Sequence, residues 1–307
     1  MNSIKHDPIH VTTNFYQLGT PAFPAYLSMG EIGMIIEGGT GPTFQIIVDQ
    51  IRTMGIDPEK IKYIVLTHTH ADHIGGVPHF KRAWAHIKLL ASPVAAKILK
   101  KKELINEFIL VDTGIAQLMK AKQEIDKLPP ALEEYSFEVD STVQEGDRIE
   151  LGNGVVWDIY ETPGHSPCQI ALYEETEGTL VLGDATGFYV PEKDAFWPNY
   201  FVSLESYCDS IRKLAKLPAK RAVLSHNCVV EGDVEKHLKK AMQATEDYHN
   251  ELMARLERGE DPESIAMDKA RFVDSLTDIQ PFKVMYDLCR IMINRSRKSD
   301  QESNFEI

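Results

Sequence analysis

Short apolar runs and helical periods alternate along the first three quarters of the chain. Runs bounded by Gly and Pro predict strands at residues 15–19, 24–29 and 33–39. Apolar positions then recur at helical spacing over 43–54, and Gly55 supplies a C-cap signal. The compact apolar run 61–66 predicts a buried strand, and the polar segment THTHADHIGG follows it directly.

The rest of the chain continues this alternation and then becomes helical. A long helical stretch is predicted over residues 92–133, ending at Pro129-Pro130. Further strands are predicted at 135–140, 147–151, 155–163, 178–184 and 221–227, with a helix at 203–217. From 234 to 297 the pattern is helical, with a break near 259–262. We therefore expect an α/β fold followed by a helical C-terminal extension.

Composition narrows the classes of partner. The 307 residues carry 46 acidic and 33 basic side chains, a formal net charge of −13. This charge repels a phosphate backbone, so nucleic acid is not an expected partner. No stretch approaches the roughly 18 consecutive apolar residues of a membrane span, and the first residues lack the apolar core of a secretory signal. Because both segments are missing, we expect no membrane partner. Four widely spaced cysteines are typical of a reduced protein, so we expect a cytoplasmic location.

Histidine and aspartate residues gather after the predicted strands. Four of them lie in one run behind the strand 61–66, and three further strands each end in one more. The full set is His68, His70, Asp72, His73, His165, Asp184 and His226. Strand ends can meet at one edge of a sheet, so we expect these side chains to converge. Scattered core or solvated histidines are the alternative, and so many ligand-type residues argue against it.

The residue types indicate a site for two metals. Imidazole and carboxylate suit divalent Zn, Fe and Mn, and they do not distinguish among these ions. His68 and His70 project to the same side of an extended backbone, while Asp72 and His73 lie where the chain turns toward a second centre. A shared ligand should be a carboxylate with two oxygens, which Asp184 supplies. Two divalent metal ions could therefore share this site.

Four motifs in this order, THTHADHIGG, PGHS, LVLGDA and LSHN, resemble those of the metallo-β-lactamase-fold superfamily over about residues 12–230. The resemblance implies a four-layer αββα sandwich with its site at one edge, between the two sheets. It implies a first metal on His68, His70 and His165, a second on Asp72, His73 and His226, and Asp184 as the bridge. An aspartate here is unlike the β-lactamases of the superfamily, which commonly place a cysteine at the second metal, so antibiotic hydrolysis is not expected.

Within this superfamily, the chain resembles glyoxalase II (hydroxyacylglutathione hydrolase) and the quinolone-signal-type thioesterases. That likeness implies a catalytic domain over 1–232, with a helical insert at about 92–133, and a helical cap over 233–307. Relatives often read GHSPGH where this chain has GHSPCQ from Gly164, and GHG where it has Ser225-His226-Asn227. The tail matches no glutathione-binding pattern, so the acyl carrier, whether glutathione, coenzyme A or another, stays open.

The predicted reaction is hydrolysis of a small acyl ester, with a thioester favoured, by a hydroxide that bridges the two metals. Asp72 and Asp184 are the candidate catalytic residues, since either carboxylate could move a proton in addition to binding metal. An aromatic loop and the last helix supply the expected substrate pocket, with candidates Phe188, Tyr189, Trp197, Tyr200 and Phe282. An equally supported interpretation is that this loop packs as a hydrophobic layer beneath the C-terminal helices and does not contact substrate.

Several alternatives remain open. A lactonase differs only in the leaving group. A phosphodiesterase of the same fold would need basic residues to hold phosphate, and the acidic chain disfavours it. A regulatory protein that keeps the metal site is a third alternative, and a homodimer through the tail helices is a fourth open point. Cys168 and Cys228 follow expected ligands closely, and they are interpreted as buried thiols or as neighbours that tune the metals.

Overall fold

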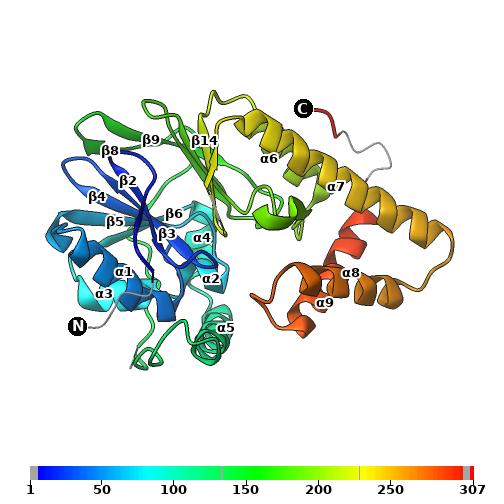
Figure 1. Ribbon diagram of the computed structural model, residues 1–307, viewed down its shortest axis with the longest axis horizontal. Coiled ribbons are helices and arrows are strands. Elements are labelled where there is room, and N and C mark those ends of the chain that lie inside the picture. Colours follow the sequence, from blue (N-terminus) through cyan, green and yellow to red (C-terminus); the bar gives the residue numbers. More distant parts are fainter. Residues whose placement is uncertain (1–5, 133, 228, 300–304) are drawn as a thin grey trace. The chain divides into compact units, whose positions relative to one another are not determined.

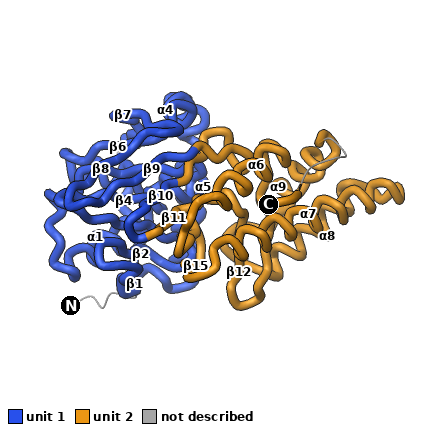
Figure 2. Tube along the Cα trace, turned by 90° about the horizontal axis from the view of Figure 1, so that it is seen from above, with its two compact units in different colours: residues 1–160, 172–177 blue, residues 161–171, 178–307 orange. Residues whose placement is uncertain are grey.

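A computed structural model describes residues 6–132, 134–227, 229–299 and 305–307. The chain forms two compact units, which Figure 2 shows in different colours. Unit 1 consists of residues 1–160 and 172–177, and unit 2 of residues 161–171 and 178–307. Across the described residues, no helix has both the length and the apolar composition needed to cross a lipid bilayer.

Unit 1 contains a seven-stranded sheet. Its order is β1 (Ile9–His10), β2 (Phe15–Gly19), β3 (Pro24–Met29), β4 (Gly33–Ile36), β5 (Ile61–Val65), β6 (Lys88–Ala91) and β7 (Ser141–Thr142). The first four strands pair antiparallel, and each pair from β4 to β7 is parallel. Parallel neighbours bring their carboxyl ends to one edge of the sheet, so the residues that follow β4 and β5 meet there.

Helices supply the crossovers that the parallel strands require. They are α1 (Gly41–Thr53), α2 (Ala71–Ile74), α3 (Val77–Ala83), α4 (Pro93–Ile98) and α5 (Lys102–Ala121), with a short 3-10 turn at Pro58–Lys60. The N-cap of α1 is Thr40, whose hydroxyl and that of Thr43 form a reciprocal capping box. Gly55 lies just beyond the helix with a φ of 69°, as its C-cap signal predicts. Helices α1 and α3 lie beside one another along this sheet (Figure 1).

A second sheet contains six strands. Its order is β15 (Val229–Glu231), β14 (Arg221–Leu224), β11 (Thr179–Gly183), β10 (Ile170–Glu174), β9 (Val155–Glu161) and β8 (Arg148–Gly152). In unit 1, β8 and β9 pair antiparallel. In unit 2, β11 and β14 pair parallel, with Gly183 opposite Leu224, and β14 and β15 pair antiparallel. The residues that follow β11 and β14 therefore also meet at one edge.

A buried tryptophan joins strands of the two sheets within unit 1. Trp157 on β9 is almost fully buried, and its indole Nε1–H donates to Ser28 Oγ on β3 at 2.9 Å. The ring of Phe15 on β2 lies 5.4 Å from the indole, measured between centroids. A buried indole N–H needs a partner, so this hydrogen bond fixes how β9 lies against β3.

Unit 2 is mainly helical beyond its strands. It contains α6 (Leu204–Leu214), α7 (Val234–Glu257), α8 (Pro262–Leu276), α9 (Phe282–Ser296), a 3-10 turn at Pro191–Lys193, and a hairpin of β12 (Phe188–Val190) and β13 (Ala195–Trp197). The C-terminal helices pack through apolar residues of α9, of which Met285, Cys289 and Met292 are buried. Tyr200, which follows β13, is fully buried, and its hydroxyl bonds Ser296 Oγ at 2.9 Å.

The predicted α/β class with a helical C-terminal region is confirmed by these sheets and helices. The predicted strands 15–19, 24–29 and 61–66 are present as β2, β3 and β5. The break near 259–262 separates α7 from α8, and a second break precedes Phe282. The sequence patterns did not predict β6, β10 or the β12–β13 hairpin. The boundary at residue 232 stays a prediction.

Two predicted elements differ from the structure. The helical stretch predicted over 92–133 is present as α4 and α5, but it is broken between them and stops at Ala121, where the apolar period ends and Gln123 takes a left-handed φ of 60°. Glu133 lies outside the described residues. The strand predicted at 135–140 is absent as well, and this part of the chain pairs with β6 only from the first residue of β7 onward. The carboxylate of Asp140 accepts the Leu89 N–H at 2.7 Å and so takes a donor that a longer strand would have used.

Replacing Ser28 by alanine should lower the free energy of unfolding by about 1–3 kcal/mol, because the indole N–H of Trp157 is left buried without its acceptor. Urea unfolding of S28A measures this loss. The matched control is S141A, which removes the same hydroxyl from an exposed position and should change the free energy by no more than about 0.5 kcal/mol. Equal stabilities of the two variants would contradict the role given to this hydrogen bond.

Candidate metal centre

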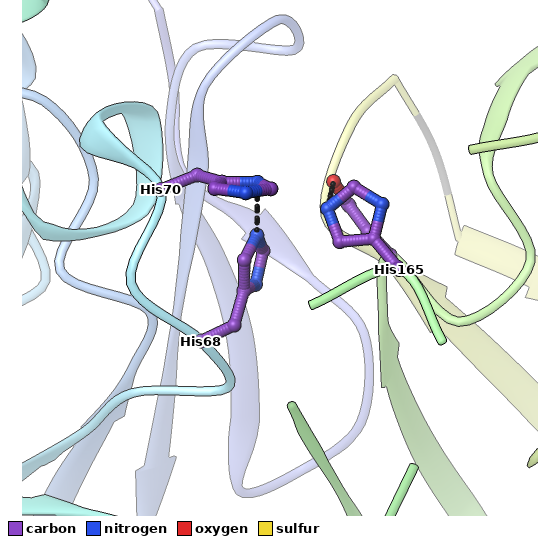
Figure 3. Close-up of side chains that lie close together, drawn as sticks. His68, His70 and His165 are labelled. Carbon is purple, nitrogen blue, oxygen red and sulfur yellow. Dashed lines mark hydrogen bonds and ion pairs between the residues drawn. The ribbon is translucent and has the colours of Figure 1, made fainter. Parts of the chain in front are cut away.

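Unit 1 carries the first four predicted ligands on one short segment behind β5. His68 and His70 lie in the extended stretch after the strand, and His70 is the N-cap residue of α2. Figure 3 shows the two imidazoles turned toward one another, with His68 Nε2 3.1 Å from His70 Nδ1. His68 is fully buried. Two imidazoles that face each other at this distance offer ring nitrogens to a common point, as a metal site requires.

Helix α2 then turns Asp72 and His73 in a different direction. His73 Nδ1 lies 3.3 Å from Glu37 Oε2, and His73 Nε2 lies 3.6 Å from Asp72 Oδ2. The His73 ring is 4.1 Å from the His68 ring between centroids. The change from extended chain to helix between His70 and Ala71 thus separates the four side chains into two pairs that stay close together.

Glu37 is a residue of this cluster that sequence reasoning missed. It follows β4, is fully buried, and accepts a hydrogen bond from Thr67 Oγ1 at 2.6 Å. Ligand atoms of Glu37, His68 and His73 all lie within 4.8 Å of one another. The available signal was an acidic residue that ends the apolar run GMIIE beside the run that leads to His68. Because β4 and β5 are parallel neighbours, the residues after them share one edge.

The backbone of Glu37 is also unusual. Its φ of 70° lies in the left-handed region, which a residue with a long side chain rarely adopts. Its N–H donates to Val65 O at 3.0 Å, so this conformation is held by a backbone hydrogen bond to the end of β5. Strain of this kind is concentrated at functional sites. Here it turns the carboxylate toward Thr67 and His73.

Unit 2 carries the other three predicted ligands. His165, Asp184 and His226 follow β9, β11 and β14, and all three are buried. His165 Nε2 lies 3.4 Å from Asp184 Oδ2, and His226 Nε2 lies 3.9 Å from Asp184 Oδ1. Each oxygen of the one carboxylate therefore faces a different imidazole.

The His165 ring is held in one orientation. Its Nδ1–H donates to the backbone carbonyl of Asn199 at 2.9 Å, which leaves Nε2 turned to Asp184. A hydrogen bond from one ring nitrogen to a backbone carbonyl is the usual way in which a metal-binding histidine is oriented. Gly164 is needed just before it, since its φ is 132° and an added Cβ would lie 2.4 Å from the backbone N of Tyr207.

His226 is oriented by its neighbours too. Asn227 takes a left-handed φ of 71°, and its Nδ2 donates to Tyr189 O at 2.7 Å. Asparagine tolerates this conformation better than most residues. The ring of Phe188 lies 5.2 Å from the His226 ring. The asparagine that replaces glycine in the common GHG motif therefore serves to anchor the loop to β12.

Within unit 1, the donor set of Glu37, His68 and His73 fits a divalent cation. Buried imidazoles and carboxylates lie a few ångströms apart, and the separations of 3.6 and 3.9 Å are longer than good hydrogen bonds. Such groups are costly to bury together unless a cation or proton compensates them. Nitrogen and oxygen donors suit zinc and other borderline divalent metals, of which zinc is the typical ion for this donor chemistry.

The expected pocket residues all lie in unit 2, in different environments. Phe188 and Trp197 are buried, Tyr189 is half-buried, Tyr200 is buried against α9, and Phe282 is 36% exposed. The hydrogen bond between Tyr200 and Ser296 on α9 favours packing beneath the C-terminal helices, and not a place in the substrate pocket, for Tyr200. Cys168 is buried, forms no disulfide, and has its Sγ 3.1 Å from Ser166 Oγ, while Cys228 lies outside the described residues.

The chain belongs to the metallo-β-lactamase superfamily. The family model described as "Metallo-beta-lactamase superfamily" matches residues 30–226, which include all seven predicted ligands. Membership of this superfamily supports a metal-dependent hydrolase. The confirmed resemblance is to the superfamily and not to one branch of it.

Three known proteins illustrate the relationship. The "Probable metallo-hydrolase YflN" of Bacillus subtilis is 26% identical over 233 residues, which cover 71% of this chain and 82% of that protein. The "N-acyl homoserine lactonase AttM" of Rhizobium radiobacter is 29% identical over 173 residues, covering 55% of this chain and 57% of the lactonase. The structure of BJP-1, a subclass B3 metallo-beta-lactamase of Bradyrhizobium japonicum, has a TM-score of 0.58 at 19% identity and covers 83% of this chain and 97% of that one.

Replacing Glu37 by alanine should weaken metal binding about 10- to 100-fold, because His73 loses the carboxylate that orients its ring. Competition with a chromophoric chelator measures the change. The control is E37Q, which keeps an oxygen to accept the Thr67 hydrogen bond and should lose less. A folded E37A variant with the affinity of the unmodified protein would show that Glu37 does not orient the site.

Proposed function

We propose that this protein is a dinuclear metal-dependent hydrolase that cleaves a small acyl thioester. The observation that carries the proposal is the position of Asp184, whose two oxygens face His165 at 3.4 Å and His226 at 3.9 Å. The resemblance assigns His165 and His226 to different metals. A carboxylate turned to a ligand of each is what a bridging residue requires.

The proposed ligand sets follow the order of the motifs. The first metal would be held by His68, His70 and His165, the second by Asp72, His73 and His226, and both by Asp184. The facing rings of His68 and His70, and the separate pair of Asp72 and His73, support this division within unit 1. Two metals are proposed, with zinc, iron and manganese all compatible with the donors.

The bound cations would lower the pKa of a coordinated water and polarise the acyl carbonyl. The protein's own residues would orient the reacting groups and move protons. Asp72 is the more accessible of the two candidate carboxylates, with its side chain 12% exposed against 7% for Asp184. A proton taken from water would pass more readily to Asp72, while both oxygens of Asp184 are directed at imidazoles.

An acyl thioester is favoured by the likeness to glyoxalase II and the quinolone-signal-type thioesterases, which have the same ligand types and a helical C-terminal region. The aromatic residues near His226 support an apolar acyl group, since the Phe188 ring contacts that imidazole. A lactone is the second candidate, supported by the 29% identity to the lactonase AttM. A reducing, cytoplasmic location is part of the proposal, supported by three described cysteines that form no disulfide, Cys168, Cys208 and Cys289.

The proposal predicts that turnover of aryl and acyl-coenzyme A thioesters is lost on chelation and returns when divalent metal is added back. A panel of thioesters, N-acyl homoserine lactones and bis(p-nitrophenyl) phosphate, run on the same metal-loaded sample, measures this preference. D72N removes a proposed ligand and should reduce turnover to the uncatalysed level, whereas D49N, on the outer face of α1, should leave turnover unchanged.

Faster hydrolysis of lactones than of thioesters would replace the proposed substrate with the second candidate. Turnover that survives complete chelation would overturn the metal-dependent reaction itself.

A further inference from the structure

Asp112 is a buried carboxylate that the proposed reaction does not use. It lies in the middle of α5 and is only 8% exposed, although aspartate is seldom buried without a reason. Its Oδ1 accepts a hydrogen bond from the Gly41 N–H at 2.8 Å. Gly41 is the first residue of α1, where unbonded N–H groups and the helix dipole favour a negative charge.

Two glycines make room for this carboxylate. A Cβ added at Gly41 would lie 2.4 Å from Asp112 Oδ2, and one added at Gly75 would lie 2.2 Å from Oδ1. Neither glycine has a positive φ, and that of Gly75 is −57°, which any residue can adopt. Glycine is therefore present at both positions because the carboxylate approaches the backbone closely, and not because of backbone conformation.

Gly75 connects this contact to the metal-binding segment. It is the C-cap residue of α2, the four-residue helix that carries Asp72 and His73. A single helical turn is not stable by itself and depends on tertiary contacts. On one side, Gly38 N–H donates to His73 O at 2.7 Å and so ties α2 to the loop after β4. Asp112 supplies the contact from α5.

We propose that Asp112 is a positioning residue for the metal centre. Its carboxylate, seated between Gly41 and Gly75, holds α2 in place and thereby sets the positions of Asp72 and His73. The inference rests on the proposed metal site. It assigns to helix α5 an indirect part in metal binding, through the position of α2, although α5 itself carries no proposed ligand.

Burial of the Asp112 carboxyl is unfavourable by itself. Burial raises its pKa to about 6, and the Asp72 carboxylate raises it too, although the hydrogen bond from Gly41 acts in the opposite direction. A carboxylate kept buried in this place is therefore expected to have a role other than stability.

The test uses the full chain loaded with Co(II), whose visible absorption bands report the coordination geometry. D112A and G75A should each weaken Co(II) binding about tenfold and change the band positions. D112A removes the carboxylate that contacts α2, and the Cβ added in G75A pushes α2 and the carboxylate apart. D112N keeps an oxygen to accept the Gly41 N–H, so it should show a smaller change in the same direction. Thermal melting at pH 8 is measured on every variant.

D140N is the matched control. Asp140 is another carboxylate of unit 1 that accepts a backbone N–H, from Leu89 at 2.7 Å, and it pairs with Lys81 at 3.0 Å. Its replacement should lower the melting temperature and leave Co(II) affinity and bands unchanged. If D112A fails to fold, G75A and D112N still decide the question.

Folded D112N and G75A variants with unchanged Co(II) affinity and bands would overturn the positioning role and leave the proposed function intact. A wild-type chain that binds no Co(II) would overturn both together. Weaker binding and shifted bands in G75A and D112N, with no such change in D140N, would support the inference.

Discussion

The carboxylate of Asp184 and the two imidazoles it faces are the contact on which the account of this protein depends. The three groups are buried and follow three different strands, and the Asp184 oxygens lie 3.4 Å from His165 Nε2 and 3.9 Å from His226 Nε2. Imidazole and carboxylate donors of this kind suit a divalent cation.

Strand direction explains why the ligands meet. In unit 1 the parallel pair β4–β5 places Glu37 beside Thr67, and in unit 2 the parallel pair β11–β14 places Asp184 beside His226. Both pairs lie just beyond the carboxyl ends of their strands, where α/β sheets commonly position functional residues. Local backbone features then aim the side chains. The left-handed φ values of Glu37 and Asn227 and the crowded Gly164 all adjoin or contact expected ligands.

The candidate ligand residues can be picked out from the sequence because their spacing and position after apolar runs are local features, and their role as ligands stays a prediction. The run from His68 to His73 follows β5 directly, and Asp184 and His226 follow β11 and β14. Glu37 and Asp112 were not predicted, because their roles depend on contacts between residues 30 or more positions apart. Nothing adjacent to Asp112 on α5 indicates that two distant glycines make room for it.

The incorrect secondary-structure predictions have a similar origin. Residues 135–140 alternate apolar and polar side chains, yet Asp140 bonds Leu89 N–H through its carboxylate and the ladder starts later. Residues 122–128 lie between a helix and two prolines, and the local pattern did not reveal that the helix had already ended at Ala121. In both segments a single side chain or backbone angle decides the outcome, and periodicity averages over such details.

The most direct test of the central claim is metal stoichiometry in the unmodified protein and in D184N, measured by elemental analysis after equilibration with excess zinc and removal of loosely bound ions. The account predicts about two zinc ions per chain in the unmodified protein and a loss at both sites in the variant, because one carboxylate serves both metals. Two tightly bound ions in D184N, with the affinities of the unmodified protein, would contradict it.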